Sequence, residues 1–191
     1  MKILVVVDMQ YDFTTGPLGN KECVAVIPNV ISAIKNDTYD HIIFTKDTHQ
    51  NNYLQTQEGQ KLPVPHCIEG SDGWNIVDEV FCAADGKHID VVCKPTFGSI
   101  ELGGLLERYS DESEEPVEVD FCGVCTGICV ISNAMITKAF IPEAKVCIIE
   151  KACACVTPQS HQTAIEAMRT CQIDIISVSY THLRAHETLM N

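Results

Sequence analysis

Residues 117–140 read VEVDFCGVCTGICVISNAMITKAF, and the order of patterns within them indicates the fold class. Polar and apolar residues alternate over 117–122, as in a strand, until Gly123 interrupts the alternation. A helix is expected over 127–140. A strand that passes directly into a helix is the repeating unit of α/β proteins, so the stretch predicts that class.

The same succession of strands and helices runs along the chain. Residues 3–7 (ILVVV) form an unbroken apolar run, typical of a strand that is covered on both faces. We predict a three-layer α/β/α fold with a mostly parallel, doubly wound central sheet, formed by residues 1–177 as a single domain. Further strands are expected at 41–45, 88–93, 117–122, 145–149 and 173–176, and further helices at 23–35, 75–81, 102–109 and 157–170.

The last stretch, residues 178–191 (VSYTHLRAHETLMN), differs from the rest of the chain. It has no core pattern and resembles the translated read-through of a sequencing adapter. We expect a non-native or disordered tail, and we exclude His182 and His186 from any site.

Composition narrows the classes of partner. The chain of 191 residues has a net charge of −13, which disfavours nucleic acids and anionic membrane surfaces. Residues 3–7 are too short for a signal peptide or a membrane span, so a cytoplasmic location is expected. In that reducing compartment, most of the eleven cysteines are expected to be buried thiols, with a catalytic or metal-binding minority.

Three polar residues fall where the expected strands end. Ligands of an open parallel sheet bind beyond these ends, where we place Asp8, Lys94 and Cys129. Burial would raise the pKa of Asp8 and suit it to proton transfer; a helix cap or a salt bridge with Lys94 is the alternative. Cys129 lies in the first turn of a helix, with Thr126 as its expected N-cap. The helix amides and Lys94 would both stabilise a Cys129 thiolate.

Cys122 and Cys125 invite two other interpretations. A zinc site needs a second ligand pair, and Cys153-x-Cys155 is a poor match in spacing. A thioredoxin-like redox pair should open a helix, whereas Cys122 lies inside the expected strand. We therefore favour structural roles for both thiols.

A second group of polar residues follows the strand at 41–45. Asp47, His49 and His66 are ligand types suited to Zn, Fe or Mn, and Glu58 lies between them on the same long loop. By spacing alone, solvated loop residues remain the alternative.

Together these pieces resemble the isochorismatase-like cysteine hydrolases and, within them, the nicotinamidases. The resemblance covers residues 3–176 and rests on motifs in the family's order. These motifs are VVVDMQYDF (5–13), KDTHQNNY (46–53), LPVPHCIEGSDGW (62–74), CKPTFGS (93–99) and GVCTGICV (123–130).

The resemblance implies a cysteine amidohydrolase that converts nicotinamide to nicotinate and ammonia, a reaction of pyridine nucleotide biosynthesis. It implies that Asp8 is the proton acceptor, that Cys129 forms a thioester and that Lys94 holds both in register. Backbone amides of Cys125 and Cys129 would meet the oxyanion, next to a cis peptide at Val124–Cys125.

The resemblance also implies a cofactor and a pocket. A divalent metal ion (Zn, Fe or Mn) would be held by Asp47, His49, Glu58 and His66. Phe13 and Gln10 are implied as pocket residues. Family members often assemble, so a homo-oligomer remains open. The family usually has Asp where this chain has Gly127.

Two other functions remain open at this point. One is hydrolysis of another small amide, such as an N-carbamoyl or ureido compound. The other is a non-enzymatic metal- or redox-binding protein that uses the cysteine-rich stretch. Tyr53 and Trp74 are interpreted as packing residues, and His161 as a structural residue away from the strand ends.

Overall fold

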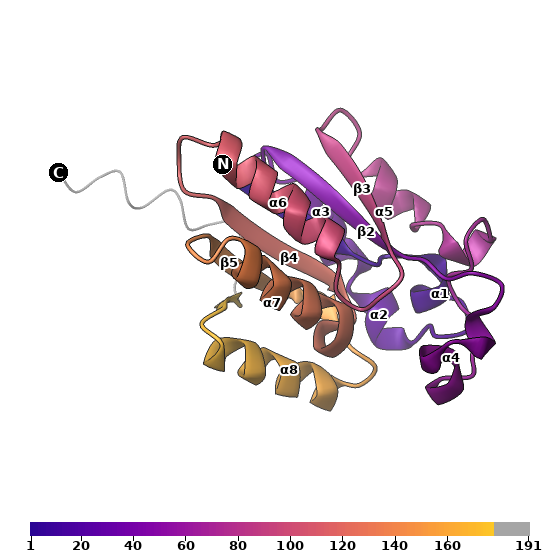
Figure 1. Cartoon of the computed structure of the whole chain (residues 1–191). Coiled ribbons are helices and arrows are strands. Elements are labelled where there is room, and N and C mark those ends of the chain that lie inside the picture. Colours follow the sequence, from indigo (N-terminus) through magenta and orange to yellow (C-terminus); the bar gives the residue numbers. More distant parts are fainter. Residues whose placement is uncertain (178–191) are drawn as a thin grey trace.

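The computed structural model describes residues 1–177, so the expectations for 178–191 lie outside the described residues. Its centre is a six-stranded sheet in the order β3-β2-β1-β4-β5-β6 (Figure 1). Every neighbouring pair in this sheet is parallel. The predicted fold class is confirmed, and the sheet of the described residues is parallel throughout.

The central strands are covered on both faces, as their apolar sequences predict. All of Ile3–Val7 is buried, and Val119 and Phe121 on the neighbouring strand are fully buried too. The strands are β1 (Lys2–Val7), β2 (His41–Asp47), β3 (Ile89–Lys94), β4 (Glu118–Val124), β5 (Lys145–Ala154) and β6 (Asp174–Ile176).

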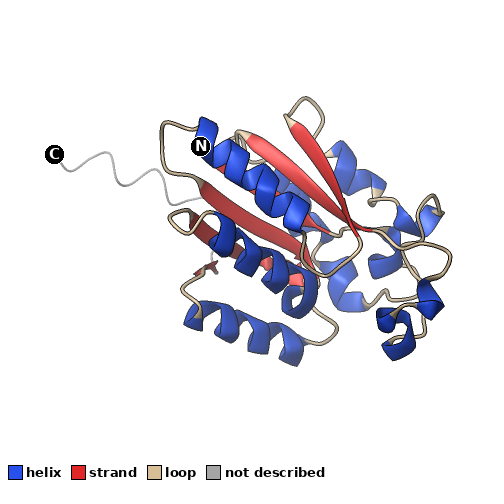
Figure 2. Cartoon of the chain, in the orientation of Figure 1, coloured by secondary structure: helices blue, strands red, loops and turns tan. Residues whose placement is uncertain are grey.

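Helices cover the two faces of the sheet (Figure 2). Figure 1 shows α6, α7 and α8 on one face and α3 and α5 on the other. No helix among residues 1–177 is long and apolar enough to cross a membrane. The helices are α1 (Tyr11–Thr14), α2 (Lys21–Ala25), α3 (Ile27–Ile34), α4 (Gln57–Lys61), α5 (Asp78–Cys82), α6 (Ile100–Glu112), α7 (Ile131–Phe140) and α8 (Pro158–Thr170), with 3-10 turns η1 (Tyr53–Gln55) and η2 (Asp72–Trp74) and a π-helical turn η3 (Thr126–Val130).

The helix predicted over 23–35 is instead two helices, α2 and α3. Pro28 lies in the first turn of α3, where its missing N–H leaves no helical bond unmade. The segment after β2, expected to be a loop, contains η1 and α4, and α4 carries Glu58. These helical turns are too short for hydrophobic periodicity to reveal them.

The strand order has a topological switch point at the middle of the sheet. Successive strands move outward in one direction from β1 and in the other from β4, so β1 and β4 flank the point where the direction changes. Ligands of doubly wound sheets bind at this point, beyond the carboxyl ends of the strands. Asp8 follows β1 there, and η3 follows β4.

Candidate active site

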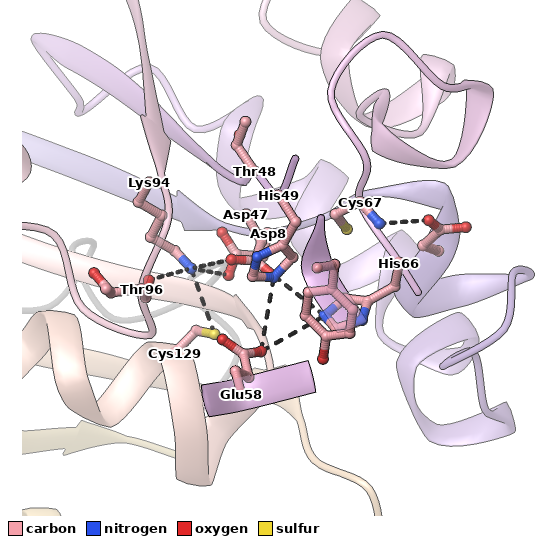
Figure 3. Close-up of polar contacts among 12 residues, drawn as sticks. Asp8, Asp47, Thr48, His49, Glu58, His66, Cys67, Lys94, Thr96 and Cys129 are labelled. Carbon is pink, nitrogen blue, oxygen red and sulfur yellow. Dashed lines mark hydrogen bonds and ion pairs between the residues drawn. The ribbon is translucent and has the colours of Figure 1, made fainter. Parts of the chain in front are cut away.

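Asp8, Lys94 and Cys129 come together at the carboxyl ends of three different strands (Figure 3). Lys94 Nζ lies 2.7 Å from Asp8 Oδ2 and 3.6 Å from Cys129 Sγ. Asp8 and Lys94 are fully buried, and only 6% of Cys129 is exposed. The lysine therefore lies between a carboxylate and a thiol that water barely reaches.

Burial decides the charge of the thiol. It raises the pKa of Cys129 well above the usual value, the nearby Asp8 raises it further, and Lys94 only partly offsets them. Lys94 lowers the pKa of the Cys129 thiol, as expected, but burial outweighs this effect. For the sulfur to act as a nucleophile, its proton would have to pass to an acceptor.

Asp8 is the carboxylate placed to take that proton. Burial raises its pKa and Asp47 adds to the rise, while Lys94 opposes it. The Thr45 hydroxyl donates to Asp8 Oδ1 at 2.6 Å and stabilises the ionised form. Asp8 has a φ of 48°, in the left-handed region, which a non-glycine residue adopts rarely. No pattern in the sequence reveals Thr45, because its partner Asp8 lies 37 residues away.

The turn that carries Cys129 is anchored to its surroundings by Asn133, another residue that the sequence pattern did not reveal. The amide of Asn133 donates to the Cys129 carbonyl at 2.8 Å and to the Phe97 carbonyl at 3.2 Å, and its oxygen accepts the Ser99 N–H at 2.9 Å. The fully buried Asn133 thus joins α7 and the nucleophile turn to the loop that follows β3.

The turn itself differs from the expected helix start. The Val124–Cys125 peptide is cis, as the resemblance implied. Cys125 is the N-cap of η3, so Thr126 is the first helical residue and does not cap the helix. The Thr126 hydroxyl lies 2.8 Å from His161 Nδ1 instead. His161 is therefore beside the nucleophile turn, and the expectation that it lies away from the strand ends is wrong.

Asp47, His49 and His66 form a compact group of ligand atoms that all lie within 4.8 Å of one another. Asp47 Oδ2 is 2.9 Å from His49 Nε2 and 3.4 Å from His66 Nε2. His66 Nδ1 bonds to the Val64 carbonyl at 2.8 Å, which turns Nε2 toward the group. One carboxylate and two imidazoles fit a divalent transition metal.

Glu58 lies at the edge of this group. Its Oε1 is 3.7 Å from His49 Nε2 and 3.9 Å from His66 Nε2. Tyr53 is buried against both imidazoles, with ring centroids 4.7 Å from His49 and 5.0 Å from His66. The Phe13 ring stands edge-on to His66 at 5.6 Å. The short helices after β2 therefore bring the Glu58 carboxylate, a fourth candidate ligand, and the Tyr53 ring to the compact group, and α1 brings Phe13.

Lys94 also links the two clusters. Its Nζ lies 3.5 Å from Asp47 Oδ1, while Asp47 Oδ2 faces the imidazoles. Burial would lower the pKa of Lys94, but the negative charges of Asp8 and Asp47, and that of Cys129 when it is ionised, outweigh burial and raise the pKa. The two groups of polar residues are therefore parts of one site.

The side chains of Gln10 and Asp12 form hydrogen bonds to the backbone of the segments that carry the site residues. The Gln10 side chain accepts the Asp47 N–H at 2.7 Å and donates to the carbonyls of Asp47 and Trp74 at 2.9 and 2.8 Å. Its carboxamide is thus fully engaged with backbone, and a substrate-pocket role for Gln10 is not supported. Asp12 Oδ2 accepts the Cys67 N–H at 2.7 Å, and a Cβ on Gly73 would overlap the Asp12 carboxylate.

The remaining predicted packing residues behave as expected. The Trp74 indole donates to the Thr48 hydroxyl at 2.8 Å and stacks under Lys46 Nζ at 3.0 Å from the ring centroid. Cys122 is fully buried, and burial raises its pKa. Neither Cys122 nor Cys125 belongs to a group of three metal-ligating side chains within residues 1–177.

A family model described as the isochorismatase domain matches residues 2–179. The chain belongs to this family. This isochorismatase domain is 29% identical over 181 residues to the nicotinamidase of Saccharomyces cerevisiae, an alignment that covers 71% of this chain and 80% of the yeast protein.

Solved structures share the fold of this isochorismatase domain. A pyrazinamidase/nicotinamidase from Streptococcus mutans matches with a TM-score of 0.77 and 23% identity, over 92% of this chain and all of that one. The pyrazinamidase of Pyrococcus horikoshii, solved in complex with zinc, matches with a TM-score of 0.72 and 25% identity, over 93% of this chain and 99% of that one. The predicted family is thereby confirmed.

Proposed function

We propose that this protein is a cysteine amidohydrolase that hydrolyses nicotinamide to nicotinate and ammonia. The proposal rests on one observation: Lys94 contacts both groups of polar residues, with its Nζ 2.7 Å from Asp8 Oδ2 and 3.5 Å from Asp47 Oδ1. It joins a nucleophile with its base to a group of metal ligands in one buried site. A non-enzymatic metal- or redox-binding protein would have no need of that arrangement.

The first half of the reaction forms a thioester. Asp8 accepts the Cys129 proton, and the thiolate attacks the carboxamide carbon. The negative charge that develops on the carboxamide oxygen faces the backbone N–H groups of Cys125 and Cys129, and such donors contribute about 3 kcal/mol each. Asp8 then gives its proton to the departing nitrogen, and ammonia leaves.

The second half releases the acid. Asp8, ionised again, takes a proton from water, which attacks the thioester carbon. The Cys129 sulfur leaves and recovers a proton from Asp8. Lys94 stays charged throughout, because Asp47 and whichever of Asp8 and Cys129 is ionised raise its pKa, and it stabilises that ionised group in turn.

In this proposal, the group of candidate metal ligands around Asp47 orients the substrate. A divalent ion held by Asp47, His49, His66 and Glu58 would offer a Lewis acid to the ring nitrogen of a pyridine carboxamide. Phe13, beside His66, would form the apolar wall against the ring. A cytoplasmic location and a homo-oligomer stay predictions.

Ammonia release tests this proposal. Purified protein, supplied with Zn, Fe or Mn in turn, is given nicotinamide and a panel of N-carbamoyl and ureido compounds. We expect release from nicotinamide by the unaltered protein, a loss of more than about 10³-fold in Cys129→Ala, and a rise in KM in His49→Ala.

Three outcomes would contradict parts of the proposal. Release from no amide would exclude the amidase, and release from another amide alone would leave the chemistry but replace the substrate. Undiminished activity in Cys129→Ala would contradict the assignment of Cys129 as the nucleophile. The His88→Ala variant is a matched control, because His88 precedes β3 at the opposite end of the sheet.

A further inference from the structure

One side chain of α8 forms a hydrogen bond to the turn that carries the nucleophile. His161 Nδ1 lies 2.8 Å from the hydroxyl oxygen of Thr126. Thr126 is the first residue of η3 and is fully buried, whereas His161 is half-buried. A buried hydroxyl needs a partner inside the protein, because leaving it unsatisfied destabilises the conformation that buries it. His161 therefore favours the conformation of η3 in which this hydroxyl points toward α8.

Thr126 lies between the two proposed oxyanion donors. The N–H of Cys125 precedes it directly, and that of Cys129 follows three residues later. Its carbonyl accepts the N–H of Ile131, which closes the π-helical turn and begins α7. Thr126 is thus held at its side chain by α8 and at its carbonyl by α7, so a shift of Thr126 would move both donors.

The part of α8 that carries His161 is itself well anchored. The helix begins with a capping box between Thr157 and Ser160, and the His161 N–H donates to the Thr157 carbonyl at 3.0 Å. A Cβ on Gly127 would lie 3.4 Å from Ala164 Cβ and 3.6 Å from the Ser160 carbonyl oxygen. The turn therefore packs directly on the first turns of α8, which offer the imidazole a fixed base.

We propose that His161 is a positioning residue: through Thr126 it holds the turn that presents the N–H groups of Cys125 and Cys129 to the substrate oxyanion. Such donors are effective because they are fixed in place before the charge develops. The inference rests on the proposed function, in which this oxyanion forms. The full charge exists only after the thiolate attacks, so a displaced turn weakens transition-state binding more than substrate binding.

Steady-state kinetics with nicotinamide, or with whichever amide the protein hydrolyses, tests the role of His161. We expect His161→Ala to lower kcat about 10–100-fold and to leave KM within about twofold. His161→Asn should restore most of kcat, because its amide lies as many bonds from Cα as Nδ1 does. His161→Leu has the shape of the asparagine without its polar atoms and should not restore kcat. Gln162→Ala is the matched control, because Gln162 is an exposed residue of the same helix that bonds to Glu166 at 2.9 Å.

A double-mutant cycle tests whether His161 acts through Thr126. Thr126→Val removes the hydroxyl and keeps the volume, so it should lower kcat about as much as His161→Ala does. The two changes remove the same hydrogen bond, and the double variant should therefore be no slower than the slower single variant. Losses that multiply in the double variant would show that the two residues act independently and would overturn the proposal.

Hydrogen–deuterium exchange supplies a readout that needs no substrate. Uptake by a peptide that spans residues 125–131 should be faster in His161→Ala and in Thr126→Val than in the unaltered protein, and His161→Asn should reverse the change. Unchanged exchange in His161→Ala would overturn the proposal, as would a kcat that His161→Leu restores as well as His161→Asn. If the unaltered protein hydrolyses no amide, faster exchange that His161→Asn reverses would uphold the support of the turn and contradict only the proposed function.

Discussion

At the scale of single residues, the Asp8 carboxylate depends on the hydroxyl of Thr45. That hydroxyl donates to Asp8 Oδ1 at 2.6 Å and lowers the pKa of a group that burial raises. Asp8 can accept the thiol proton only when it is ionised, so activity falls as the pH drops below its pKa.

We expect Thr45→Val to move the acid limb of the kcat/KM profile to higher pH. Removal of the donor destabilises the ionised form of Asp8, which raises its pKa, and the base is then lost at a pH where the unaltered enzyme still works. A pH–rate series measures the shift. Thr137→Val is the control, because the Thr137 hydroxyl bonds to the Asn133 carbonyl instead, at 2.9 Å; an equal shift in both variants would contradict the assignment.

Gly127 stands beside Cys155. It has no need of a glycine conformation, and a Cβ there would lie 3.5 Å from Cys155 Sγ and 3.4 Å from Ala164 Cβ, which is ordinary contact. We expect Gly127→Ala to raise the free energy of unfolding by about 0.5–1 kcal/mol, because alanine restricts the unfolded chain, and to leave activity within about twofold. Urea denaturation measures the first effect and ammonia release the second.

At the scale of elements, α7 holds the nucleophile turn against the loop after β3 through Asn133. We expect Asn133→Ala to lower the free energy of unfolding by about 1–3 kcal/mol, because the Ser99 N–H loses its acceptor inside the protein. It should also lower kcat, since the Cys129 carbonyl is no longer tied. Thr137→Val, one turn along the same helix, should lower the free energy of unfolding by less than about 1.5 kcal/mol. A loss in Thr137→Val as large as that in Asn133→Ala would contradict this account.

At the scale of the whole molecule, the proposed metal ligands join segments that are otherwise separate. Asp47 ends β2 and His49 follows it, whereas His66 lies 17 residues beyond His49 in a long connection. A metal ion that binds only the folded chain adds stability, about 2.7 kcal/mol when its free concentration is 100 times Kd. We expect Zn²⁺ to raise Tm in the unaltered protein and in His88→Ala, but not in His49→Ala. Equal shifts in all three would refute the ligand set.

The sequence determined the fold class and the neighbourhood of the site. An unbroken apolar strand such as residues 3–7 has to be covered on both faces, and successive strand–helix units have to run parallel. Parallel strands bring their carboxyl ends to one edge, so the positions of Asp8, Lys94 and Cys129 in the sequence already placed them close together. These inferences succeed because local patterns carry them.

Only the tertiary structure decided how the pKa values of those groups shift and which residues hold the groups in place. The pKa of the Cys129 thiol is raised because burial outweighs Lys94, and burial depends on everything packed around it. Thr45 and His161 contact the site from positions 37 and 35 residues away from their partners, and Asn133 accepts the N–H of Ser99, 34 residues away. Such contacts leave no periodic pattern in the sequence.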